Sequence, residues 1–228
     1  MGGAPMSTAS TAAHSPAESR SSFLRARLAS ALAIVPLGVW SVLHLWNNLA
    51  AFQGADAWQA AVTTYPHPFA QAFTGILVLV PLAIHMVWGI GRMVSSRPNL
   101  VRYRFYGNLK YVLQRLAGLG LLLALGAHLW LAMLHPRIEL GHAEEFQDIA
   151  QEMHFHRPTL VVYILLTLGL AFHLANGLQT FCMGWGVVAS RRGLKRLEWL
   201  VGGIFVVLLA MGWGAVYALW AAGSAAPL

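Results

Sequence analysis

The sequence contains few of the residues that a water-soluble fold needs. Only 10% of its 228 residues are charged, whereas 57% are hydrophobic and nine are tryptophan. Soluble domains usually carry about 25% charged residues. The composition therefore excludes an ordinary soluble domain and indicates an integral membrane protein.

Cysteine is almost absent, because Cys182 is the single one in the chain. One thiol excludes an intrachain disulfide and any iron–sulfur cluster held by this chain alone. The sequence also lacks Cys-x-x-Cys-His, which excludes a covalently attached c-type haem. Any haem would therefore be held by its axial ligands and by packing.

Long hydrophobic runs are what the chain has instead. Five of them are long enough to cross a bilayer core of about 30 Å as helices. They cover roughly 28–50, 69–93, 112–134, 158–183 and 198–221. Residues 1–22 are rich in Ser, Ala and Thr, which predicts a disordered tail. We therefore expect an all-α integral membrane protein, with one five-helix transmembrane domain at residues 23–228.

Charge is distributed unevenly over the loops between these runs. Thirteen of the fifteen Lys and Arg residues lie before the first run, in or around the loop between the second and third, or in the loop between the fourth and fifth. Six of the eight acidic residues lie in the other two loops. The positive-inside rule then predicts a cytoplasmic N-terminus and an outer C-terminus. The basic inner face suits anionic lipid or a protein partner, and its topological explanation argues against nucleic-acid binding.

Each of the first four runs contains a histidine between apolar neighbours. These are His44, His85, His128 and His173. An unpaired imidazole is costly inside a bilayer, so each ring is expected to have a partner. Haem iron is the natural partner, because two haems take four axial histidines and helical bundles build cofactor sites from facing helices. The pattern therefore predicts that the first four helices form a haem-binding bundle.

Helix direction predicts how these histidines pair. At a rise of about 1.5 Å per residue, His44 and His128 on outward-running spans fall in the outer half of the bilayer. His85 and His173 lie on inward-running spans and fall in the inner half. We therefore predict an outer haem between His44 and His128 and an inner haem between His85 and His173, at levels about 10 Å apart.

Three of the histidine segments carry a family resemblance that covers about residues 25–222. They are Leu-His-Leu-Trp-Asn-Asn-Leu-Ala-Ala-Phe around His44, Ile-His-Met-Val-Trp-Gly-Ile around His85 and Phe-His-Leu-Ala-Asn-Gly-Leu-Gln-Thr-Phe around His173. They resemble the cytochrome b membrane anchor of succinate:quinone oxidoreductases, specifically the single-chain, five-helix, two-haem type that includes fumarate reductase anchors.

The resemblance implies two b haems, with ligands paired first helix with third and second with fourth. It implies flavoprotein and iron–sulfur subunits on the cytoplasmic face of a bacterial-type inner membrane, and these partners would hold the FAD and the clusters. Electrons would pass from the clusters through the inner and outer haems to menaquinone or another quinone, or in reverse. Some fumarate reductases of this type have a carboxylate two residues before the fourth histidine, where this chain has Ala171.

Quinone and haem propionates each need polar partners. Hydrogen-bonding or proton-exchanging groups for a quinone near the outer haem are Asp56, Trp58, His67 and His135. Cations or hydroxyls for propionates near the inner haem are Ser30, Arg92 and Arg115. His154 and His156 in the outer loop are a weaker metal-site candidate, because they lack a third ligand.

Two other functions remain open at this stage. One is a two-haem cytochrome b that serves a hydrogenase or formate dehydrogenase. The other is a haem-free transporter whose histidines relay protons or bind metal ions. The sequence shows no inverted repeat and no paired intramembrane carboxylates, which weighs against the transporter.

Overall fold

A computed structural model of the chain describes residues 23–24, 27–64, 68–95, 102 and 104–224. Its described part is almost entirely helical and contains no strand. Five helices are long and apolar enough to cross a membrane, and they cover Arg27–Gln53, Phe69–Ser95, Tyr106–Leu140, Arg157–Gly184 and Arg191–Gly223. The predicted all-α membrane architecture is thereby confirmed. The tail at 1–22 lies outside the described residues.

The first span changes its winding along its length. It contains the π-helical turns η1 (Ala33–Gly38), the α-helix α2 (Val39–Asn48) and the 3-10 turn η2 (Leu49–Gln53). Pro36 lies inside η1. Because proline cannot donate a backbone hydrogen bond and its ring crowds the preceding turn, the helix widens there.

The other four spans each contain one long α-helix. They are α4 (Pro68–Ser95), α5 (Tyr106–Leu129) with the π turns η3 (Trp130–Leu134) and η4 (Pro136–Leu140), α7 (Arg157–Gly184) and α8 (Arg191–Gly223). The third span continues past Pro136, six residues beyond the predicted end at 134. Two short helices, α3 (Ala55–Val62) and α6 (Phe146–Phe155), join the spans at one end of the bundle.

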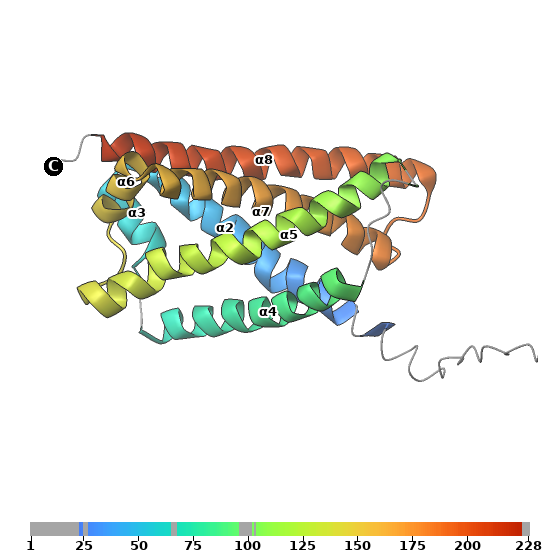
Figure 1. Cartoon of the computed structure of the whole chain (residues 1–228), viewed down its shortest axis with the longest axis horizontal. Coiled ribbons are helices and arrows are strands. Elements are labelled where there is room, and N and C mark those ends of the chain that lie inside the picture. Colours follow the sequence, from blue (N-terminus) through green and yellow to red (C-terminus); the bar gives the residue numbers. More distant parts are fainter. Residues whose placement is uncertain (1–22, 25–26, 65–67, 96–101, 103, 225–228) are drawn as a thin grey trace, which may run out of the picture.

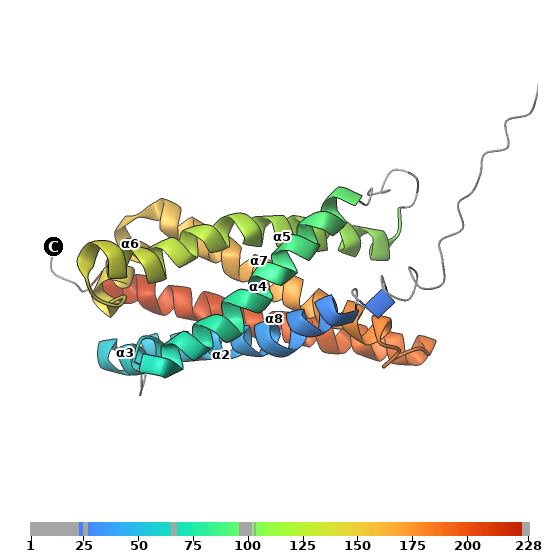
Figure 2. The same ribbon diagram turned by 90° about the horizontal axis from the view of Figure 1, so that it is seen from below.

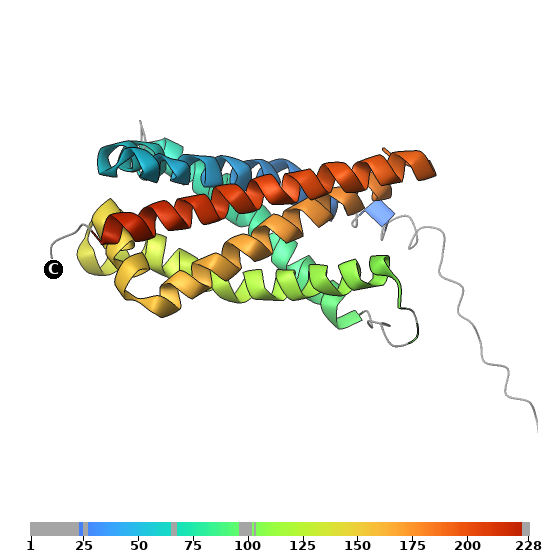
Figure 3. The same ribbon diagram turned by 90° about the horizontal axis from the view of Figure 1, so that it is seen from above.

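The spans run along one common direction (Figure 1), and α7 packs between α5 and α8. Seen from below, α4 crosses the other helices obliquely (Figure 2), and its main packing partner is η1. From above, α8 lies between α2 and α7 (Figure 3) and contacts both. Because α4 runs obliquely, it makes only limited contact with α5.

The two ends of the bundle differ in charge. We call the end that carries Arg92, Lys110 and Arg191 the basic end, and the end that carries Glu144, Asp148 and Glu152 the acidic end. Lys110 ties three helices together at the basic end, because its ammonium group lies 2.8 Å from Gln179 Oε1 and 3.2 Å from Glu198 Oε1.

A buried apolar cluster closes the acidic end. It contains Trp58 of α3, Phe146 and Met153 of α6, Tyr163 of α7 and Leu219 of α8. The Trp58 and Phe146 rings meet edge to face with centres 5.7 Å apart. Large apolar side chains elsewhere, such as Phe73 and Trp199, remain mostly exposed, as expected for a surface that faces lipid.

Candidate functional site

A cavity of about 830 Å³ lies inside the bundle and is bounded by residues of all five spans. Its volume is within the range of ligand sites, about 300–1,000 Å³. Most of its lining is apolar, and α5, which contributes many of the lining residues, has no fully buried residue. Four imidazoles project into this space, from His44, His85, His128 and His173.

The structure brings His44 and His128 together. Their ring centres are 5.9 Å apart, with an interplanar angle of 66°. His44 comes from α2 and also stacks on Trp40, with centres 4.6 Å apart. The side chain of Asn48 donates to the backbone oxygen of His44 and accepts from the buried indole of Trp58. These contacts connect this pair to the acidic-end cluster, so we call it the acidic-end pair.

His85 and His173 form a second pair. Their ring centres are 6.0 Å apart, at an interplanar angle of 79°. His85 lies on α4 seven residues before Arg92, and His173 contacts the turn of α5 that contains Gln114. This is the basic-end pair.

Both separations suit a metal ion held between two imidazoles. A metal–imidazole bond is about 2 Å long, and each ring centre lies about 1 Å beyond its nitrogen, so two rings that share one ion have centres about 6 Å apart. The apolar cavity around each pair provides room for a large flat macrocycle. The residues present therefore fit axial ligation of haem iron.

Each pair has one ring whose Nδ1 atom has a partner. His128 Nδ1 lies 3.0 Å from the hydroxyl of Tyr163, and His173 Nδ1 lies 3.2 Å from the backbone oxygen of Gln114. Such contacts fix the orientation of a ring and leave Nε2 for a metal. Sequence reasoning did not identify Tyr163 or Gln114, because their contacts join positions 35 and 59 residues apart.

A polar network supports His173 further. The Gln114 side chain donates to the backbone oxygen of His173 at 3.1 Å, and the Asn176 side chain donates to Gln114 Oε1 at 2.9 Å. Gly118 leaves room for the ring, because a β-carbon at this position would lie 3.2 Å from His173 Cε1. Asn176 belongs to the Phe-His-Leu-Ala-Asn-Gly segment, which was the one sequence signal for this network.

Replacing Tyr163 with phenylalanine is expected to weaken retention of a haem by the acidic-end pair about 10- to 100-fold. The change removes the hydrogen-bond partner of His128 Nδ1 and keeps the ring that packs in the cluster. Haem loss to a scavenger protein, followed by absorbance, measures it. Tyr217→Phe on the exposed face of α8 is the matched control. Equal loss rates in the two variants would contradict the role of the hydroxyl.

The predicted propionate partners Ser30, Arg92 and Arg115 all line the cavity. Ser30 Oγ accepts from the indole of Trp185 at 3.0 Å. The Arg115 guanidinium donates to the backbone oxygens of Arg92 and Met93. The structure thus gathers these side chains at the basic end, and their role toward propionates stays a prediction.

The predicted quinone residues are not gathered in the cavity. Asp56 is exposed in the first turn of α3, and Trp58 is 3% exposed in the acidic-end cluster. His135 Nε2 lies 3.3 Å from Glu139 Oε2. None of these three lines the cavity, and His67 lies outside the described residues. Their role toward a quinone stays a prediction.

The outer-loop histidines point to different partners. His154 Nδ1 contacts the backbone oxygen of Trp220 at 2.9 Å, whereas His156 Nδ1 contacts Thr159 Oγ1 at 2.7 Å. Among the described residues, no group of three His, Cys, Asp or Glu side chains is placed to hold a metal ion. The structure gives the weak metal-site candidate at His154 and His156 no support.

Comparison with known proteins gives two matches. The family described as "Succinate dehydrogenase/Fumarate reductase transmembrane subunit" matches residues 92–211, which is more than half of the chain and includes His128 and His173. The chain is also 29% identical over 194 residues to the succinate dehydrogenase cytochrome b558 subunit of Bacillus subtilis (strain 168). That alignment covers 84% of this chain and 94% of the relative. The chain belongs to the succinate dehydrogenase/fumarate reductase transmembrane subunit family.

Proposed function

We propose that this chain is the membrane anchor and electron-transfer subunit of a succinate:quinone oxidoreductase and that it binds two b haems. His44 and His128 would be the axial ligands of one haem, and His85 and His173 those of the other. The observation that carries the proposal is that one cavity of a family member contains two imidazole pairs. The ring centres are 5.9 Å apart within one pair and 6.0 Å apart within the other.

The haems would supply one-electron redox chemistry between the partner subunits and a quinone. The chain's own residues orient the rings and keep water away from them. Tyr163 and Gln114 set the direction in which His128 and His173 point. Apolar side chains from all five spans line the rest of the cavity. Ser30, Arg92 and Arg115 would balance the propionate charge at the basic end.

The basic end would face the cytoplasm by the positive-inside rule. Among the described residues, the exposed cations at this end include Arg92, Arg102, Arg104, Arg191, Arg192, Lys195 and Arg196. They suit the docking of the iron–sulfur subunit and its flavoprotein, and they also suit anionic lipid headgroups. Succinate or fumarate chemistry would then take place on the flavin of the partner. We propose a bacterial-type inner membrane, with Asp56, Trp58, His67 and His135 as quinone-site residues at the outer, acidic end.

The two other functions have less support. Family membership favours a succinate dehydrogenase or fumarate reductase partner over a hydrogenase or formate dehydrogenase. The name of the Bacillus subtilis relative, a cytochrome b558 subunit, favours a haem protein over a haem-free transporter.

The proposal is tested by purifying the chain with its partner subunits and measuring haem. We expect two b haems per chain, with low-spin optical and electron paramagnetic resonance spectra typical of two nitrogen ligands. Haem extraction and protein quantification give the ratio. A single haem per chain, or a colourless preparation, would contradict the proposal.

A further inference from the structure

Glu144 is a buried carboxyl at the acidic end that the proposed function does not use. It lies in the loop between η4 and α6, outside the five spans, and is only 7% exposed. Within the described part of the chain, its Oε2 atom is buried and has no hydrogen-bond partner. A buried polar atom without a hydrogen-bond partner costs free energy, so the burial of the Glu144 carboxyl needs an explanation.

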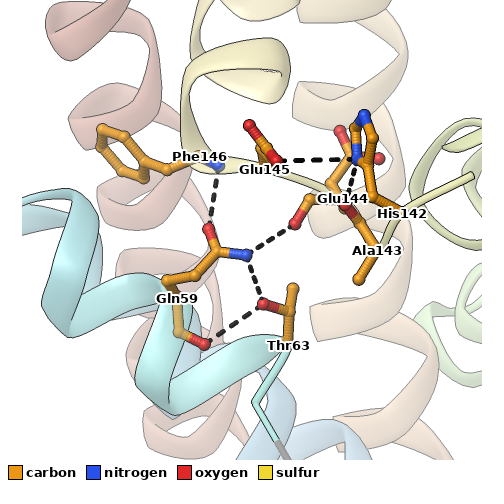
Figure 4. Close-up of polar contacts among 7 residues, drawn as sticks. All are labelled: Gln59, Thr63, His142, Ala143, Glu144, Glu145 and Phe146. Carbon is orange, nitrogen blue, oxygen red and sulfur yellow. Dashed lines mark hydrogen bonds and ion pairs between the residues drawn. The ribbon is translucent and has the colours of Figure 1, made fainter. Parts of the chain in front are cut away.

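The loop that holds Glu144 is fixed by Gln59 of α3 (Figure 4). The Gln59 amide nitrogen donates to the backbone oxygen of Glu144 at 2.9 Å and to Thr63 Oγ1 at 2.6 Å. Its amide oxygen accepts a hydrogen bond, 3.1 Å long, from the backbone nitrogen of Phe146, the first residue of α6. Because both sides of the loop are held, the Glu144 side chain is kept in its buried position.

Burial raises the pKa of the Glu144 carboxyl to about 7, and neighbouring charges act in both directions. Asp148 and Glu152 of α6 raise the pKa through like charge, whereas His142 of the loop and Arg137 of η4 lower it. From α3, the nearest contact is the neutral amide of Gln59, while Asp56 is exposed in the first turn. The carboxyl therefore exchanges a proton with its surroundings near neutral pH.

Tyr163 of α7 connects Glu144 to the acidic-end pair. It lies within electrostatic range of Glu144 and Glu152, and its hydroxyl is 3.0 Å from His128 Nδ1. Tyr163 and His128 both line the cavity, whereas Glu144 is not among its lining residues. A charge on Glu144 therefore acts on a residue that contacts His128, in a low-dielectric region where electrostatic effects are strong.

We propose that Glu144 takes up a proton when the haem of the acidic-end pair is reduced and releases it when that haem is oxidised. An electron from the iron–sulfur partner, through the basic-end haem, or from quinol would reduce this haem, and the Glu144 carboxylate would accept one proton from solvent at the acidic end. Oxidation returns the electron to the quinone or to the iron–sulfur partner and the proton to solvent. This inference rests on the proposed function, which supplies the haem and its redox partners.

Electrostatics fixes the direction of the coupling. An added electron makes the region more negative and favours the neutral carboxyl, and by linkage the protonated carboxyl favours the reduced haem. The midpoint potential of the acidic-end haem should therefore fall as pH rises through about 7. For a tenfold coupling between the two equilibria, the total fall is about 59 mV for a one-electron couple.

Spectroelectrochemical titration of the purified complex at a series of pH values tests the proposal. We expect a pH-dependent potential for the acidic-end haem in the natural protein and a nearly constant one in Glu144→Gln. Glu145→Gln is the matched control, because Glu145 is the exposed neighbour of Glu144 and pairs with His142 at 3.8 Å. A flat profile in the natural protein, or an unchanged slope in Glu144→Gln, would overturn the proposal.

Glu144→Asp keeps the test decisive if the glutamine variant does not assemble. An aspartate has a lower ordinary pKa than a glutamate, so the midpoint of the pH dependence should move to lower pH. An unchanged midpoint would also overturn the proposal. A preparation without a haem at the acidic-end pair refutes the proposed function, whereas two haems with pH-independent potentials refute only the role of Glu144.

Discussion

Replacing His173 with alanine is expected to remove the basic-end haem and to leave the acidic-end haem in place. His85 alone would then face an empty position across the 6.0 Å gap, and one imidazole cannot supply both axial bonds. The haem content should fall from two to one per chain. Electron flow from the partner subunits to quinone should fall to background, because the basic-end haem would be the first acceptor in the chain.

Two further variants make this expectation specific to the pairing. His128→Ala should remove the acidic-end haem only, because its ring faces His44 at 5.9 Å. His156→Ala is the control, because that histidine is exposed and contacts Thr159 rather than the cavity. Haem extraction with optical redox titration distinguishes the two haems by potential. If His44→Ala and His85→Ala removed the same haem, the proposed pairing would be refuted.

The sequence alone was enough to predict which of the four histidines pair with one another. A histidine in an apolar run is conspicuous, and the alternating direction of the spans assigns His44 with His128 and His85 with His173 to shared levels. The structure brings these same rings together. Periodicity and span length are local properties, so they are readable without knowledge of the packing.

The contacts around the rings could not be predicted in this way. Tyr163 and Gln114 reach His128 and His173 across different helices, and nothing in their local sequence marks them as partners. Trp58 is an instructive case, because an aromatic near a span end is usually interfacial. Here it is buried and donates to Asn48, ten residues earlier, because α3 folds back onto the bundle.

The short helices α3 and α6 and the buried Glu144 at the acidic end were not predicted from the sequence, for a related reason. Gly54 adopts a φ of 101°, a conformation that suits glycine, and this turn starts the short helix α3. Helix α6 packs on α8 so closely that a β-carbon on Gly223 would collide with the backbone oxygen of Ala150. Short helices in polar loops have weak periodicity, so their presence and the burial of Glu144 depend on tertiary contacts.

Replacing Gly118 with leucine is expected to remove the basic-end haem without any change to a ligand. Even a β-carbon at this position would lie 3.2 Å from His173 Cε1 and 3.5 Å from His173 Nδ1. The larger leucine side chain must displace the ring or move α5 away from α7, and such overpacking usually costs about 1–3 kcal/mol. A displaced ring also loses the contact between its Nδ1 atom and Gln114.

Gly120→Leu is the matched control on the same helix, because a β-carbon at Gly120 meets nothing within 4 Å. Both variants add the same side chain to α5, so any general effect of leucine on the helix cancels in the comparison. We expect one haem per chain in Gly118→Leu and two in Gly120→Leu, measured by haem extraction from equal amounts of protein. The acidic-end haem should keep its potential in both variants. Retention of two haems with unchanged potentials in Gly118→Leu would mean that the His173 ring does not lie against α5 in the haem-loaded protein, and the positioning role of Gln114 would be refuted with it.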